Sequence, residues 1–381
     1  MRARNFFSRV RWIRLLLVSM FLFVVFCVCF IKFDTPAAAQ FTDNVLRPLL
    51  GSDRVVALEK IFYNFSDKVD QIRYQNTAGS VPTFDVGESV DSTSLASESN
   101  LDLISLVPLS SLKTLKGEGV WHNISLPIFP NKEVMAYSFV RPDSERAFAT
   151  VTLVQLDMKS LHLSTVAGKR EPGGPIGNFG PGVVPDSIIQ SGNLVAAFDG
   201  GFQFRDGEYG MIVGDKTYLP LKSDLGTLVG YTDGTIKIVN YKEGQDLGSH
   251  IEFVRQNCPI LIEDGMMAVS DIKNKHLWGR TPTTAIYTWR SGIGITAKGN
   301  LLYAVGNNLT PTTLALALKM AGAQNAIQLD INPYWVRFNI FRSSGGSAYS
   351  SFTLNKNLTN GAESYLKGYS KDFFYVYKSN P

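Results

Sequence analysis

Residues 15–31 form an apolar run without a charged residue, and this run limits the structures that the N-terminal segment can adopt. Its length lies at the lower end of the ~17–25 residues that a transmembrane helix needs. Five arginines precede the run, whereas Lys32 and Asp34 follow it. Because positive charge is retained in the cytoplasm, the sequence predicts a cytoplasmic basic segment at 1–14, a transmembrane anchor at 15–33 and an extracytoplasmic remainder.

A cleavable signal peptide is the alternative interpretation of the same segment. Ala37-Ala38-Ala39 has the small-residue pattern of a cleavage site, and the basic start fits the first part of a signal peptide. Cleavage near Ala39 would give a secreted protein, and retention would give a single-pass membrane protein. Both interpretations place the rest of the chain outside the cytoplasm.

The remainder has the composition of a folded protein. Hydrophobic residues make up 45% and charged residues 18% of the sequence, and 24 Phe with 15 Tyr favour aromatic-rich strands. The net charge of +4 stems from the N-terminal arginines, so no nucleic-acid partner is predicted. Cys258 is the single cysteine beyond the apolar run, so core burial must stabilise the fold without an intramolecular disulfide.

The spacing of apolar residues divides the chain further. Residues 43–75 carry them at helical spacing, which predicts an amphipathic helical stalk or oligomerisation helix. Residues 77–105 are rich in Ser, Thr, Asp, Glu and Gly, the composition of a polar linker. The main domain is then expected at 118–381, and the oligomeric state is left open.

Short strand-like runs recur in the main domain, at 149–156, 161–166, 227–231, 235–239, 292–297 and 301–305. Thr310 and Pro311 begin a predicted helix that Gly322 ends, and a strand at 326–329 then delivers Asp330 to its C-terminal end. The predicted fold class is therefore α+β, a strand-rich single large domain with a few buried helices, preceded by an N-terminal transmembrane helix.

An apolar strand is predicted to end at Asp199-Gly200-Gly201. The glycines would allow positive φ and a close backbone approach to a ligand, while the carboxylate of Asp199 emerges at the strand end. A hairpin turn is the alternative, because Asp-Gly-Gly suits a type I′ or II′ turn equally well.

A second carboxylate, Asp330, is followed by Asn332, Tyr334 and Trp335. Aromatic faces pack on sugar rings, and carboxylates bind hydroxyls or transfer protons, so this segment is a candidate carbohydrate site. Its alternative is an Asx-turn with aromatic packing.

A candidate phosphate-binding segment is Arg280-Thr281. The guanidinium fork of arginine matches phosphate oxygens, although a solvated side chain is the alternative. Further acidic residues lie in Gly-rich turns, and one of them could be a second catalytic carboxylate: Glu171, Asp206, Glu208 and Asp264.

The chain contains four scattered histidines without the spacing of a zinc site. The sequence predicts no cofactor. Binding of a Ca²⁺ or Mg²⁺ ion through oxygen ligands is left as an alternative.

Four motifs in order resemble the phosphodiester glycosidase family: residues 196–202, 259–265, 280–281 and 323–330. The likeness spans about residues 145–335, and the namesake of the family removes N-acetylglucosamine from a phosphodiester. Family members carry Asn where Asp199 stands, and Gly-Gly followed by serines where Ile331-Asn332 stands. These two exchanges remove an amide and backbone N–H donors at the expected phosphate site.

The resemblance implies a glycoside hydrolase, and the apolar run at 15–31 predicts that this hydrolase is exported and membrane-tethered. Its substrate would be a sugar-phosphodiester or a related envelope or exopolysaccharide glycan. It implies catalytic roles for Asp199 and Asp330. Motif position and side-chain chemistry together predict substrate-binding roles for Arg280, Thr281, Gly200, Gly201, Asn332, Tyr334 and Trp335. The alternative is a catalytically inactive glycan-binding or scaffold protein in exopolysaccharide or cell-envelope assembly.

Overall fold

The computed structural model describes residues 41–74, 81–86, 98–173, 179–269, 278 and 287–379. The predicted anchor at 15–33 lies outside these residues. Within the described ranges, no helix combines the length and the apolar character needed to cross a membrane. The chain forms two compact units, residues 1–62 and residues 63–381.

The first unit contains a π-helical turn, a short helix and the start of a long helix. These are η1 (Thr42–Leu46), α3 (Arg47–Leu50) and α4 (Ser52–Tyr74). Gly51 adopts φ 81° and separates α3 from α4, a backbone conformation that glycine adopts without steric cost. The second unit begins inside α4, at residue 63.

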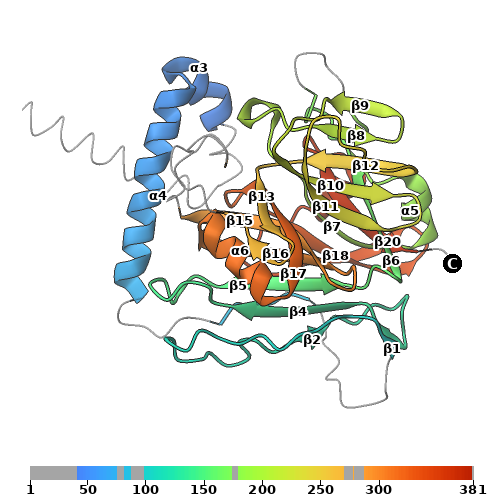
Figure 1. Cartoon of the computed structure of the whole chain (residues 1–381), viewed down its shortest axis with the longest axis horizontal. Coiled ribbons are helices and arrows are strands. Elements are labelled where there is room, and N and C mark those ends of the chain that lie inside the picture. The colour runs from blue at the N-terminus through green and yellow to red at the C-terminus, as the bar shows by residue number, and fades with distance from the viewer. Residues whose placement is uncertain are drawn as a thin grey trace, which may run out of the picture. The chain divides into compact units, whose positions relative to one another are not determined.

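Three sheets with antiparallel pairing form most of the second unit (Figure 1). The largest has eight strands in the order β14-β13-β17-β15-β16-β5-β4-β2. Its strands are β2 (His122–Asn123), β4 (Met135–Val140), β5 (Val151–Leu156), β13 (Ile260–Glu263), β14 (Met266–Met267), β15 (Thr288–Thr296), β16 (Leu301–Leu309) and β17 (Ala323–Ile331).

Two five-stranded sheets accompany it. The β7 sheet has the order β19-β18-β7-β20-β6, with β6 (Leu161–Val166), β7 (Leu194–Asp199), β18 (Phe338–Gly345), β19 (Ala348–Thr353) and β20 (Phe373–Lys378). The β10 sheet has the order β11-β10-β12-β8-β9, with β8 (Met211–Val213), β9 (Lys216–Leu219), β10 (Leu225–Tyr231), β11 (Ile236–Tyr241) and β12 (Ile251–Gln256). Two short strands, β1 (Glu98–Ser99) and β3 (Lys132–Glu133), pair in parallel.

Few helices occur among the described residues of this unit. Apart from the end of α4, they are α5 (Asp186–Ser191), η2 (Phe204–Asp206), α6 (Pro311–Met320) and α7 (Ala362–Lys367). The prediction of a strand-rich α+β domain with a few helices is therefore confirmed.

The predicted helix after Thr310 is also confirmed, as α6. The Thr310 side chain accepts a hydrogen bond from the backbone N–H of Thr313, and the backbone N–H of Thr310 in turn donates to the side-chain oxygen of Thr313. Gly322 follows with φ 91°, as the predicted stop requires. Helix α6 contacts β15, β16 and β17 and so covers one face of the eight-stranded sheet (Figure 1).

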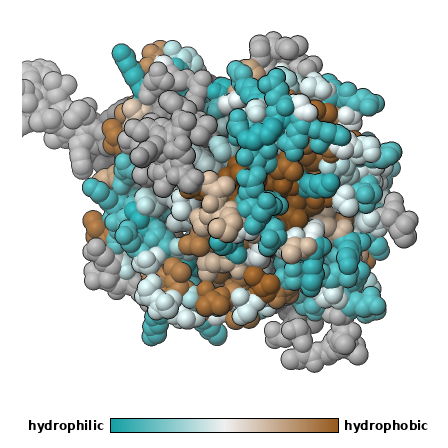
Figure 2. Space-filling model, in the orientation of Figure 1, coloured by the Kyte–Doolittle hydropathy of each residue, from teal (hydrophilic) through white to brown (hydrophobic). Residues whose placement is uncertain are grey.

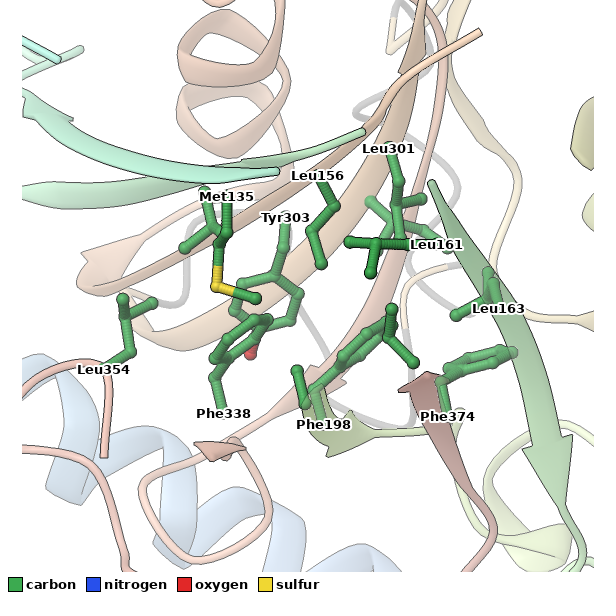
Figure 3. Packing of buried hydrophobic residues seen from close by; sticks show 14 of the residues in the cluster. Met135, Leu156, Leu161, Leu163, Phe198, Leu301, Tyr303, Phe338, Leu354 and Phe374 are labelled. Carbon is green, nitrogen blue, oxygen red and sulfur yellow. The ribbon is translucent and has the colours of Figure 1, made fainter. Parts of the chain in front are cut away.

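The main core lies where the β7 sheet faces the eight-stranded sheet (Figure 3). Phe198 of β7 and Phe338 of β18 stack with ring centroids 5.5 Å apart. Both rings contact Tyr303 of β16, at centroid distances of 5.2 Å and 4.7 Å. Burial of this apolar surface is the main stabilising contribution of the interface, and it fixes the distance between the strand ends of the two sheets.

Part of the predicted polar linker is tied to the sheets. Phe84 packs on Tyr137, with ring centroids 4.5 Å apart, and Val86 is buried in the main core. The backbone N–H of Asp102 donates to the side-chain oxygen of Gln155 at 2.5 Å. Composition misses this order because two apolar residues and a few hydrogen bonds are enough to fix a segment whose other residues are polar. The predicted domain boundaries stay predictions.

Candidate active site

The strand pairing brings several charged residues to the same end of β7. Strand β7 is antiparallel to β18 and β20, with Phe198 opposite Phe338 and Asp199 opposite Phe373. Arg337, directly before β18, and Lys371, two residues before β20, therefore lie beside the C-terminal end of β7. Asp330 comes from the end of β17 in the facing sheet.

Asp199 is buried and connects four segments of the chain. Its Oδ1 accepts hydrogen bonds from the hydroxyl of Tyr303 at 2.8 Å and from the backbone N–H of Arg337 at 3.1 Å. Its Oδ2 accepts from the hydroxyl of Ser291 at 2.5 Å and from the backbone N–H of Asp330 at 3.3 Å. A carboxylate has about four acceptor positions, so these donors occupy all of them.

Burial raises the pKa of Asp199, and the hydrogen bonds from Ser291, Arg337 and Tyr303 oppose that rise. The structure thus brings Asp199 and Asp330 together, as the motifs predict. It leaves Asp199 without an open acceptor position for a metal ion or a water molecule.

Asp330 is paired with Lys371, whose ammonium donates to Asp330 Oδ2. The other oxygen accepts from the backbone N–H of Ile331 at 2.9 Å. Burial raises the pKa of Asp330 to about 7, with a smaller raising contribution from Asp199, while the positive charge of Lys371 opposes the rise. A carboxyl group that titrates near neutral pH is suited to proton transfer.

Two aromatic residues lie next to this pair. The Lys371 ammonium is 4.6 Å from the centre of the Trp335 ring, a cation–π distance. The rings of Tyr334 and Trp335 are tilted against each other at 4.4 Å, and the Arg337 guanidinium lies 5.4 Å from the Tyr334 ring. Both aromatic side chains are partly exposed, so they remain available to a sugar ring.

Asn332 forms the Asx-turn that was the alternative interpretation of this segment. Its side-chain oxygen accepts from the backbone N–H of Tyr334 at 3.1 Å and of Trp335 at 3.3 Å. Its φ of 70° is a conformation that asparagine tolerates better than most residues. Asn332 therefore orients the two aromatic rings.

Gly200 and Gly201 do not have the geometry that the sequence suggested. Neither is among the residues with positive φ, and β7 pairs with β18 and β20 instead of ending in a hairpin. A Cβ on Gly200 would lie 2.5 Å from the Asp372 carbonyl oxygen, and one on Gly201 would lie 2.5 Å from an Arg255 guanidinium nitrogen. The glycines are needed because a buried ion pair approaches the backbone closely.

That ion pair joins Arg255 of β12 to Asp372. Arg255 Nε is 2.8 Å from Asp372 Oδ2 and its Nη2 is 3.2 Å from Oδ1, a bidentate contact between fully buried groups. The guanidinium also donates to the carbonyl oxygens of Phe202, Tyr209 and Gln256. The backbone N–H of Gly201 donates to Asp372 Oδ2 at 3.0 Å, so the pair fixes the segment after Asp199.

Glu171 is one of the four acidic residues that the sequence places in Gly-rich turns, and it lies beside Lys371. Its backbone N–H donates to the carbonyl oxygen of Ser370 at 2.9 Å, and its Oε2 accepts from the backbone N–H of Phe204 at 2.8 Å. Burial raises the pKa of Glu171, and the charge of Lys371 lowers it.

The predicted phosphate ligands Arg280 and Thr281 lie outside the described residues, so their role stays a prediction. Among the residues that the structure does describe, no group of three or more His, Cys, Asp and Glu side chains could hold a metal ion.

Tyr303→Phe is expected to lower the free energy of unfolding by about 1–3 kcal/mol, because Asp199 Oδ1 would lose a buried donor. Urea unfolding curves of both proteins measure the loss. Tyr349→Phe is the control, since Tyr349 is partly exposed and its hydroxyl contacts only backbone groups, the carbonyl oxygens of Ile188 and Ile189 and the N–H of Leu194. Equal losses in the two variants would contradict a special role for the Tyr303–Asp199 contact.

Comparisons with known proteins give a family and distant structural neighbours. Residues 192–330 match the family described as phosphodiester glycosidase. No curated protein sequence matches the chain.

Three solved structures are similar at low identity. The catalytic domain of zebrafish N-acetylglucosamine-1-phosphodiester alpha-N-acetylglucosaminidase, auto-inhibited by its pro-peptide, has 14% identity and a TM-score of 0.44, over 65% of this chain and 85% of that chain. A hypothetical protein from Synechocystis has 13% identity and a TM-score of 0.36, over 65% and 63%. A putative exported protein from Burkholderia pseudomallei has 10% identity and a TM-score of 0.25, over 55% and 74%.

The matched range starts just before β7 and ends at Asp330. It contains Asp199 and three of its hydrogen-bond donors, Ser291, Tyr303 and the backbone N–H of Asp330, whereas Lys371 lies beyond it. Over residues 192–330, this chain is therefore similar to the phosphodiester glycosidase family, as its motifs predict.

Proposed function

We propose that this chain is a glycosidase that cleaves the bond between a sugar and a phosphodiester group, with Asp330 as its proton-transfer residue. The observation that carries the proposal is the pair of Asp330 and Lys371, in which burial raises the carboxyl pKa to about 7. The family match over residues 192–330 supports the reaction class.

In the proposed reaction Asp330 is the general base. It accepts a proton from water as the water oxygen bonds to the anomeric carbon and the bond from that carbon to the phosphodiester oxygen breaks. The products are the free sugar and a phosphate monoester. Because phosphate is a good leaving group, it needs less protonation than the alcohol of an ordinary glycoside.

The cations near Asp330 would neutralise the phosphate. Lys371 and Arg337 are the candidate phosphate ligands that the structure describes. Arg280 is a further candidate, predicted from the sequence alone. Glu171 is suited to be the second carboxylate, because it is partly exposed and lies beside Lys371. Tyr334 and Trp335 would stack on the sugar ring.

Asp199 is predicted from the motifs as catalytic, and its hydrogen bonds support a positioning role instead. Its four acceptor positions bind Tyr303, Arg337, Ser291 and the Asp330 backbone. In this arrangement Asp199 would hold Asp330 at a fixed place and leave the reaction itself to Asp330.

We further propose that the protein acts outside the cytoplasm, tethered through residues 15–33, on an envelope or exopolysaccharide glycan. The uncharged run and the arginines before it support this location. Protease added to intact cells should then digest the C-terminal domain, and full protection of that domain would contradict the proposed location.

Lys371→Met is expected to lower kcat/KM at neutral pH tenfold or more. Loss of the ammonium leaves the Asp330 carboxylate unpaired, so the pH of half-maximal activity should move upward. Initial rates of sugar release from a sugar-phosphodiester, measured between pH 5 and pH 9, test both effects. Lys356→Met, which changes an exposed lysine, is the control, and an identical pH profile in both variants would contradict the proposal.

A glycan-binding protein without turnover is the second candidate. The observation in its favour is that Asp330 and Lys371 are both almost fully buried, so neither charge is open to solvent. Saturable glycan binding, with no sugar released from any phosphodiester by the unmodified chain, would decide for it.

A further inference from the structure

Polar groups and an aromatic ring on one side of helix α4 contact the rest of residues 63–381. Asp67 accepts hydrogen bonds from Arg146 Nε and Nη2, each at 2.9 Å. Asp70 accepts from the side-chain amide of Asn308 at 3.3 Å. The Tyr74 ring stacks on Phe148 with centroids 4.9 Å apart. Residues 67, 70 and 74 share one face of the helix, which is therefore its docked face.

The opposite face of the same helix is apolar and exposed. Phe65, Val69 and Ile72 have exposed fractions of 59%, 42% and 66%. At 3.6 residues per turn, they lie roughly 140–200° around the helix from Asp67. An amphipathic helix ordinarily turns its apolar face toward the core, so α4 is oriented the opposite way.

Isolated hydrophobic residues are ordinary on a protein surface. The face seen in Figure 2 carries hydrophilic and hydrophobic residues side by side. The residues on α4 differ because they line up along one side of a single helix. We call Phe65, Val69 and Ile72 the apolar stripe of α4. A continuous stripe of this kind marks an interaction surface.

The charges on α4 indicate which partner fits the stripe. Lys68 and Arg73 are exposed and lie on either side of it, roughly 60–80° from its centre. Among the side chains that the structure describes on α4, both carboxylates, Asp67 and Asp70, belong to the docked face. The stripe is therefore bordered by positive charge.

A second copy of the chain would be a poor partner for this surface. Pairing two stripes would bring Lys68 and Arg73 of both copies close together, and the described carboxylates of α4 lie on the far side of the helix. Coiled coils of identical chains ordinarily balance such positions with opposite charges. An apolar face bordered by Lys and Arg is instead the pattern of a helix that lies in a membrane interface.

We propose that the apolar stripe of α4 docks on an anionic lipid surface. Phe65, Val69 and Ile72 would enter the boundary between headgroups and acyl chains, to a depth of roughly 5–10 Å. Lys68 and Arg73 would contact the lipid phosphates on either side. The docked face, through Asp67 and Arg146, would then hold the sheets at a fixed orientation above the lipid.

The test places a spin label on the stripe in the full chain. Cys27→Ser and Cys29→Ser remove the cysteines of the apolar run, and Cys258 is buried. A nitroxide is attached at Phe65→Cys or, as a control beside the stripe, at Asn64→Cys. The protein is reconstituted into vesicles of phosphatidylcholine, or of equal parts phosphatidylcholine and phosphatidylglycerol. Collision with oxygen, compared with a water-soluble nickel chelate, reports immersion of the label in lipid.

In the anionic vesicles, the ratio of oxygen to nickel accessibility at position 65 is expected to exceed that at position 64 several-fold. Lys68→Glu with Arg73→Glu should lower the population of the docked state about tenfold or more, because each basic residue attracts anionic lipid. Lys319→Glu with Lys356→Glu changes the net charge equally at exposed sites and should leave docking unchanged.

Two outcomes would overturn the proposal. One is a label at position 65 that stays as accessible to the nickel chelate as the label at position 64 in both kinds of vesicle. The other is dipolar coupling between labels of two chains that does not depend on lipid charge, which would assign the stripe to a second copy. Neither outcome bears on the glycosidase, whose activity is measured separately.

Discussion

Asp330→Asn is expected to lower kcat/KM for sugar release by roughly 10²- to 10⁴-fold, the range that general acid–base catalysis contributes. The amide cannot accept the proton of the attacking water, yet its oxygen can still accept the hydrogen bond from Lys371. In the unmodified protein kcat/KM should rise with pH, with a midpoint near the pKa of about 7 that burial gives Asp330. That pH dependence should be absent from any activity that the variant retains.

Unfolding experiments separate this loss of activity from loss of the fold. The folded-state pKa of Asp330, about 7, lies above its ordinary value of 3.8, so the folded protein binds this proton more tightly than the unfolded chain. Its contribution to stability is full below about pH 4 and is lost as the pH rises to about 7. Relative to Asp330→Asn, the unmodified protein should therefore lose up to roughly 4 kcal/mol of unfolding free energy over that interval.

Asp215→Asn is the matched control, because Asp215 is an exposed carboxylate. It should leave the rate of sugar release unchanged. If Asp330→Asn retained full activity with an unchanged pH profile, Asp330 would not be the general base, whatever the stability of the variant.

Local sequence signals predicted the parts of the fold that depend on neighbouring residues. Thr310, Pro311 and Gly322 determine the ends of α6 by capping and backbone preference, which involve only adjacent turns. Asp199 and Asp330 were recognisable because each ends an apolar strand, and strand ends are where side chains leave the core. The proximity of Asp199 and Asp330 depends on the packing of two sheets. The motifs implied this proximity, whereas the spacing of the residues along the sequence could not predict it.

The groups around these carboxylates are distant in sequence and carry weak local signals. Ser291 and Tyr303 occupy buried strand positions where an apolar residue would fit the pattern equally well. Lys371 precedes an aromatic strand, and its partner Asp330 is 41 residues earlier. The position of Arg255 in a buried strand did indicate an ion-pair partner, because a buried charged residue requires one. The sequence could not identify that partner as Asp372.

The same packing explains why the glycines after Asp199 were misinterpreted. Asp-Gly-Gly fits a tight turn by local preference, and that preference is weak compared with the burial of β7 between β18 and β20. Gly200 and Gly201 are required by Asp372 and Arg255, which approach from other segments. Glycine has no side chain to indicate which kind of close approach it serves.

Arg255→Met is expected to lower the free energy of unfolding by about 3–5 kcal/mol, because it leaves Asp372 as an unpaired charge in the core. Three carbonyl oxygens would lose their donor as well. Chemical unfolding of the variant measures the loss. Lys222→Met is the control, since it breaks an exposed ion pair with Glu208 and should cost at most about 1 kcal/mol.

The double variant Arg255→Met with Asp372→Asn distinguishes the ion pair from mere packing. The second substitution removes the charge at position 372, and the oxygen of the new amide can still accept from the backbone N–H of Gly201. The double variant should therefore be more stable than Arg255→Met alone, and the coupling free energy between the two positions should reach about 2 kcal/mol or more. Additive losses at the two positions, or a loss in Arg255→Met no larger than in Lys222→Met, would contradict this account. In that case the close approach at Gly200 and Gly201 would be a consequence of sheet packing, and the ion pair would not be its cause.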